Sequence, residues 1–136
     1  MGISAITASE PRTGEASAGC TVFIVEDAPN ICARLVELVE RTGNARVVGQ
    51  AGTAREAVQG ILSTSPRFTL LDYHLRGGTG LEVLRAVRGA GSETVVIVLT
   101  NDPDPVYRQA CLASGARWFL DKSSEFLKVR DIVAGL

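Results

Sequence analysis

The chain has 136 residues, a formal net charge of −1, 46% hydrophobic residues and 21% charged residues. This length suffices for one domain with a buried core, and the composition is typical of a globular protein rather than a disordered or fibrous one. Lysine and arginine form no cluster of five or more along the chain, so we expect no direct binding to nucleic acid.

Three widely spaced cysteines, Cys20, Cys32 and Cys111, indicate neither a disulfide framework nor a metal motif, which favours a reducing cytoplasm. Residues 1–19 are rich in Ser, Ala, Thr and Gly and lack the basic start and apolar core of a signal peptide. We predict a disordered tail there. Because no apolar run is long enough to span a membrane, we expect a cytoplasmic protein whose folded domain covers residues 20–136.

The first regular pattern is the β-branched and aromatic run 21–25, which ends abruptly at Glu26 and Asp27. It predicts a buried strand that runs into an acidic turn. Apolar residues at helical spacing follow between the start signal Pro29 and the stop signal Gly43, and they predict the first helix.

The second and third units repeat this order of strand and helix. Residues 46–51 are a strand candidate, and Thr53 with Glu56 matches a capping box that opens a helix. The short apolar run 68–71 then ends at Asp72, and a glycine-rich loop leads into a helix with apolar residues at helical spacing.

The last two units begin with 94–99, the strongest strand signal of the chain, which ends at Thr100. Asp104 as N-cap and Pro105 as first helical residue predict the fourth helix. A strand over 118–120 and an amphipathic helix from Phe126 to the end complete five units.

Strands that alternate with helices predict an α/β fold, a doubly wound five-stranded parallel sheet with helices on both faces. Ligands of such sheets bind outside the carboxyl ends of the strands. The predicted strands place five functional residues at that edge: Glu26, Asp27, Asp72, Thr100 and Lys122.

Each of these residues alone is explained by an ordinary turn, cap or solvated charge. Together they have a chemical meaning, because three crowded carboxylates repel one another unless a hard cation such as Mg²⁺ joins them. Asp72, on the central strand, is then the candidate nucleophile toward phosphorus. The Lys122 ammonium and the Thr100 hydroxyl are candidates to stabilise the phosphoryl oxygens.

The chain resembles the response-regulator receiver family, the CheY-like domains of two-component signalling, from Thr21 to about Val133. The motifs that carry the resemblance are Glu26-Asp27, Asp72, Gly77-Gly78-Thr79-Gly80, Thr100, Gly115-Ala116 and Phe119-Leu120-Asp121-Lys122. The resemblance implies a flavodoxin-like (βα)5 fold with strand order 2-1-3-4-5. It also implies a phosphoacceptor in a phosphorelay rather than an enzyme with turnover.

By this resemblance Asp72 accepts the phosphoryl group and Asp27 binds Mg²⁺ directly. Glu26 acts on the metal mainly through water, and the backbone carbonyl of His74 is the remaining protein ligand. Departures from the family pattern are Glu26 in place of the commoner Asp, and Arg76 and Ser123 where Pro is frequent.

The resemblance further implies that Lys122 pairs with the phosphoryl group, that Thr100 moves to hydrogen-bond it, and that Phe119 changes its rotamer. The expected donor is a sensor histidine kinase or a phosphotransfer protein. No room for an output domain follows the last predicted helix, so we expect a stand-alone receiver. Its unidentified downstream protein would bind the face of the fourth helix, last strand and last helix.

Other functions fit the sequence less well. A haloacid-dehalogenase-like phosphatase has a second Asp two residues after its nucleophile, where this chain has His74. That histidine is more simply a pocket side chain that, with Asp102, tunes hydrolysis. A flavin-binding or Walker-type phosphate loop is absent after the first strand. The remaining alternative is a receiver-fold module that binds proteins without phosphorylation.

Overall fold

The computed structural model describes residues 20–135, and its core is a five-stranded parallel sheet. The strand order is β3-β2-β4-β7-β8, which is 2-1-3-4-5 in units, as predicted. The strands are β2 (Thr21–Val25), β3 (Arg46–Ala51), β4 (Phe68–Asp72), β7 (Val95–Thr100) and β8 (Trp118–Asp121). The predicted tail 1–19 lies outside the described residues.

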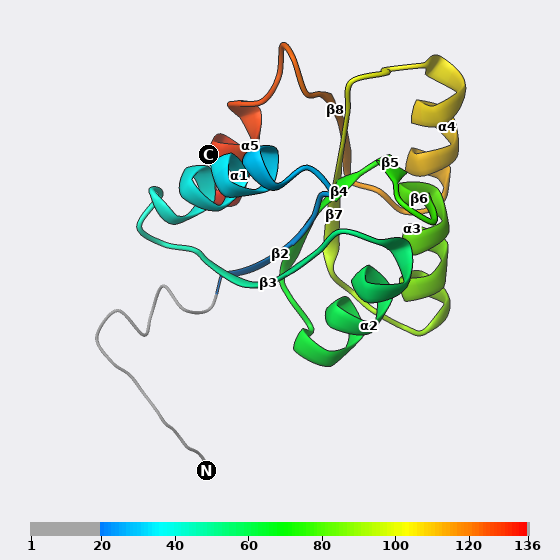
Figure 1. Cartoon of the computed structure of the whole chain (residues 1–136), viewed down its shortest axis with the longest axis horizontal. Helices are drawn as coiled ribbons and strands as arrows, with labels where there is room; N and C mark the ends of the chain where they lie inside the picture. Colours follow the sequence, from blue (N-terminus) through cyan, green and yellow to red (C-terminus); the bar gives the residue numbers. More distant parts are fainter. Residues whose placement is uncertain (1–19, 136) are drawn as a thin grey trace.

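Five helices cover the sheet, α1 and α5 on one face and α2, α3 and α4 on the other (Figure 1). They are α1 (Pro29–Glu40), α2 (Ala54–Thr64), α3 (Gly80–Gly89), α4 (Pro105–Ala113) and α5 (Lys128–Val133). None of these helices is both long and apolar enough to cross a membrane.

The two faces of the sheet carry separate hydrophobic cores, because successive side chains of a strand point to opposite sides. On β2, Val22 and Ile24 pack with α1 and α5, whereas Phe23 and Val25 pack with α2, α3 and α4. All residues of β4 are buried, since this strand lies in the middle of the sheet. The end of β4 is therefore a rigid position.

The predicted start of the fourth helix is confirmed, whereas that of the last helix differs. Asp104 caps α4, its Oδ1 accepting from the Val106 N–H at 2.7 Å, and Pro105 is the first helical residue. Helix α5 begins at Lys128, later than the apolar pattern from Phe126 indicates.

Helix capping differs partly from the prediction. The Thr53 side chain accepts from the Glu56 N–H at 3.2 Å, as the predicted capping box requires. A complete box with both hydrogen bonds is found at the start of α3, between Thr79 and Glu82.

A short hairpin after β4 was not predicted. Its strands are β5 (His74–Leu75) and β6 (Gly78–Thr79), and Gly77 takes the positive φ of +76° in the turn. A bridge between Arg76 and Thr53 attaches the hairpin to the start of α2. The glycine-rich loop is thus an ordered element beside the end of β4.

Phe23 packs between two glycines, Gly49 of β3 and Gly60 of α2. A Cβ atom at Gly49 would lie 2.5 Å from the Phe23 ring, and one at Gly60 would collide with the same ring. Because Phe23 is only 3% exposed, its ring has no free space into which it can retreat. The glycines therefore provide the volume that the ring occupies.

Replacement of Gly60 by alanine should lower the free energy of unfolding by about 1–3 kcal/mol, because overpacking outweighs the better helix propensity. Gly89→Ala is the matched control, since a Cβ there meets open space. It should leave stability unchanged or raise it by up to about 1 kcal/mol. Urea unfolding of both variants tests this, and equal effects would contradict the role given to Phe23.

Candidate functional site

Three carboxylates meet at the carboxyl edge of the sheet. Glu26 and Asp27 follow β2 directly, and Asp72 is the last residue of the neighbouring strand β4. One oxygen of each side chain lies within 4.8 Å of the others. Asp72 is only 8% exposed and Glu26 is also buried, so water does little to screen the repulsion between them.

Lys122 brings a positive charge into this cluster from the end of β8. Its Nζ lies 2.6 Å from Oε1 of Glu26 and 3.4 Å from Oδ2 of Asp72, and the side chain is almost fully buried. The other oxygen of Glu26, Oε2, accepts from the Ala28 N–H at 3.2 Å. Both oxygens of Glu26 are thus engaged by protein groups.

Burial raises the pKa of Asp72 to about 6, and the negative charge of Glu26 contributes in the same direction. Lys122 and a 3.4 Å hydrogen bond from the His74 N–H oppose this shift. Burial has the larger effect. The cluster therefore holds more negative charge than Lys122 compensates, which is the condition under which a hard divalent cation binds to oxygen ligands.

Thr100, the last residue of β7, is buried beside the site. Its hydroxyl accepts from the Asp102 N–H at 2.9 Å and lies 3.3 Å from the Asp102 carbonyl, to which it donates. The predicted phosphate-binding hydroxyl is therefore engaged here by the loop that leads into α4.

Phe119, the predicted switch residue, lies on β8 and is 7% exposed, packed in the core under α2, α3 and α4. Its neighbour Trp118 is half-buried against the other core, with the Arg117 guanidinium 5.0 Å above its ring.

The sequence analysis missed Tyr73 near the site and its contact with Tyr107. Tyr73, directly after Asp72, stacks on Tyr107 of α4, and the half-exposed His74 ring meets both rings edge-on. His74 Nε2 also lies 4.0 Å from Oδ2 of Asp102. The only sequence signal for Tyr73 was its aromatic side chain between Asp72 and His74. No local pattern links Tyr73 to α4.

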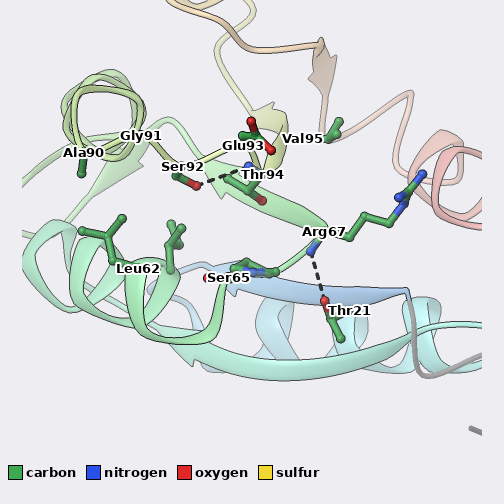
Figure 2. A pocket seen from close by; sticks show the side chains of 12 residues that line it. Thr21, Leu62, Ser65, Arg67, Ala90, Gly91, Ser92, Glu93, Thr94 and Val95 are labelled. Carbon is green, nitrogen blue, oxygen red and sulfur yellow. Dashed lines mark hydrogen bonds between the residues drawn. The ribbon is translucent and has the colours of Figure 1, made fainter. Parts of the chain in front are cut away.

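A hollow of about 610 Å³ lies at the opposite edge of the sheet, at the amino ends of β2, β4 and β7 (Figure 2). Some of its polar groups are hydrogen-bonded to each other. The backbone N–H of Arg67 donates to the Thr21 hydroxyl, and the backbone N–H of Thr94 donates to the Ser92 hydroxyl. It contains none of the clustered acidic residues, and parallel sheets bind ligands at the other edge. The acidic cluster is therefore the candidate site.

The raised pKa of Asp72 makes folding stability depend on pH. The folded state binds the proton more tightly than the unfolded state, so stability decreases as pH rises from about 4 to about 6. In metal-free buffer Asp72→Asn should be more stable than wild type at pH 7 by roughly 1 kcal/mol, because the substitution removes a buried negative charge. The ion pair between Lys122 and Glu26 remains in the variant. Urea unfolding should show this advantage disappearing near pH 4; a pH-independent difference would contradict it.

The model of the response regulator receiver domain family matches residues 22–134. A putative transcriptional regulator of Pseudomonas aeruginosa is 33% identical over 118 residues, which are 84% of this chain and 56% of that protein. The transcriptional regulatory protein DesR of Bacillus subtilis is 29% identical over 104 residues, 76% of this chain and 51% of that protein. The chain spans about half the length of these curated relatives.

Solved receiver structures agree with the fold. The signal receiver domain of the putative response regulator NarL from Mycobacterium tuberculosis is 30% identical, with a TM-score of 0.77 over 86% of this chain and 98% of that one. A LuxR-family two-component response regulator from Aurantimonas sp. is 26% identical, with a TM-score of 0.77 over 85% of each chain. The family match, the sheet order and the acidic cluster together show that this chain belongs to the response regulator receiver domains of two-component signalling.

Proposed function

We propose that this receiver takes up a phosphoryl group on Asp72 and thereby changes a protein-binding face. The donor would be the phosphohistidine of a sensor histidine kinase or a phosphotransfer protein. The observation that carries the proposal is the buried carboxylate of Asp72, which shares a cluster with Glu26 and Asp27 and lies 3.4 Å from Lys122. Since the family is one of receivers and not of true enzymes, the chemistry is one self-catalysed transfer followed by slow loss.

In the transfer step, an Asp72 carboxylate oxygen attacks phosphorus. The new O–P bond forms while the P–N bond of the donor breaks, and the electron pair stays on the donor imidazole, which takes up a proton. The Lys122 ammonium is close enough to Asp72 to stabilise the negative charge on the oxygens of a phosphoryl group bound there. The Thr100 hydroxyl would donate a further hydrogen bond.

An acidic triad of this kind is typical of the Mg²⁺ site of receivers. The three converging carboxylates, whose charge Lys122 only partly offsets, fit a hard cation with oxygen ligands. Asp27 and Asp72 would bind the ion directly, Glu26 mainly through water, and the His74 backbone carbonyl would complete the protein ligands. Bound Mg²⁺ supplies positive charge to the phosphoryl oxygens.

The proposed response starts at Thr100, whose hydroxyl must leave the Asp102 backbone to reach the phosphoryl group. This releases the loop before α4. Because the Phe119 ring is already buried, phosphorylation would stabilise the inward ring over any outward state rather than create a new position. We propose that the affected face comprises α4, β8 and α5 and binds an as yet unidentified downstream protein.

The second candidate is a receiver module that binds its partner without phosphorylation. The observation in its favour is the Glu26–Lys122 ion pair, which occupies the lysine without any phosphoryl group. The same pair is exchangeable, however, because an acyl phosphate on Asp72 would present oxygens to a lysine already 3.4 Å away.

Acetyl phosphate with Mg²⁺ should label Asp72, as detected by mass spectrometry or a phosphate-affinity gel. Asp72→Asn should take no label, because its amide lacks the nucleophilic oxygen. Lys122→Ala should slow labelling by about 10- to 100-fold, since a fixed cation is lost. Lys128→Ala, which removes an exposed lysine paired with Glu125, is the matched control. Label on His74, or labelling that survives removal of Mg²⁺, would overturn these roles.

Beryllofluoride, a stable mimic of the phosphoryl group, should alter Trp118 fluorescence and shift amide signals from Val106 to Gly135 when Mg²⁺ is present. Thr100→Ala should abolish the distant changes and keep those around Asp72, because the hydroxyl is the proposed link between them. Changes confined to the pocket in the wild type, with and without a binding partner, would favour the phosphorylation-independent module.

A further inference from the structure

Helix α4 is held to the fold by few buried side chains. Cys111 is its one fully buried residue, while Val106 in its first turn is 71% exposed. The helix lies at the side of its layer, next to α3 and β8 (Figure 1). The few contacts near its start therefore determine where its exposed surface lies.

The main aromatic contact of this first turn is the stack of Tyr107 on Tyr73. The two ring centroids are 4.4 Å apart and the planes differ by 16°. Tyr107 lies one helical turn before Cys111, so both side chains are on the face of α4 that packs toward the core. The stack joins α4 to the residue that directly follows Asp72.

Tyr73 is a fixed point of the structure. Its N–H donates to the Leu99 carbonyl at 3.1 Å, and its own carbonyl accepts from the Gly80 N–H at 2.6 Å. These bonds attach it to the end of β7 and to the start of α3. Its ring is buried, and the His74 ring packs edge-on against it at 5.1 Å between centroids.

Besides the half-exposed His74 ring, which meets Tyr107 edge-on and whose Nε2 lies 4.0 Å from Oδ2 of Asp102, the start of α4 has two connections to the site. One is polar: the Thr100 hydroxyl bonds the Asp102 backbone, two residues before the N-cap Asp104. The other is the stack of Tyr107 on Tyr73. In the proposed function Thr100 gives up the polar connection, and the stack remains.

We propose that Tyr107 is a positioning residue that couples Asp72 to the surface of α4. Its stack on Tyr73 is the pivot about which the first turn of α4 moves when Thr100 withdraws. This inference rests on the proposed function. The surface that changes includes Val106 and a shallow hollow of about 540 Å³ lined by Pro105, Arg108, Gln109, Leu112 and Ala113.

The test measures beryllofluoride-induced amide shifts of residues 105–113 together with Trp118 fluorescence. Tyr107→Leu keeps an apolar side chain beside Cys111 but removes the stack, and it should reduce the α4 shifts by about twofold or more. Its Trp118 response and the labelling of Asp72 should remain, because these depend on Thr100 and Lys122. Tyr107→Phe should keep the wild-type response, and Leu62→Ala, which changes an exposed apolar residue of α2 outside this face, should not alter it.

The outcomes separate the two proposals. Undiminished amide shifts of α4 in Tyr107→Leu would overturn the coupling through the stack. Loss of these shifts in Tyr107→Phe would also overturn it, because the effect would then depend on the hydroxyl. Persistent labelling of Asp72 shows that the Leu variant is folded. A wild-type protein that shows neither label nor distant shifts would instead overturn the proposed function, and this coupling with it.

Discussion

The repulsion among Glu26, Asp27 and Asp72 is the constraint on which the site depends. Parallel pairing of β2 with β4 brings the ends of these strands together, so the backbone positions that carry the carboxylates cannot move apart without loss of the sheet. Lys122, at the end of β8, offsets part of the negative charge of the carboxylates. Burial nevertheless raises the pKa of Asp72. A site in this state gains from any further positive charge placed near the buried carboxylates of Glu26 and Asp72.

The ion pair with Glu26 limits how readily Lys122 can bind another negatively charged group. The Glu26 side chain is one methylene longer than that of an aspartate, and its carboxylate lies 2.6 Å from the lysine, whereas that of Asp72 is 3.4 Å away. The proposed phosphoryl group on Asp72 would therefore have to compete with a buried ion pair. The net gain would be the difference between two sets of charge-assisted contacts, so it would be smaller than the contribution of the new contacts alone.

The sequence predicted the strands, the sheet edge and the residues gathered there, because buried parallel strands are apolar runs that end at polar residues. It did not predict which partners those side chains choose. The attachment of Thr100 to Asp102 depends on the path of one loop, and the stack joins Tyr73 to Tyr107 across two elements. Neither contact has a local signature, since both depend on how α4 packs against the end of β4.

These side-chain partners explain how a local charge can have an effect at a distance. Asp72 itself lies within the buried strand β4, so the proposed phosphoryl group would change the partners of its neighbours rather than the sheet. In the proposed response Lys122 would give up its hydrogen bond to Glu26, and Thr100 would give up its two hydrogen bonds to the Asp102 backbone, before the new bonds form. The differential free energy is thus limited to about 1–3 kcal/mol, as is typical of coupled sites. A difference of this size would be too small to rearrange the sheet, and the proposed shift would fall on α4, whose one fully buried residue is Cys111 and whose first turn is attached by the aromatic stack.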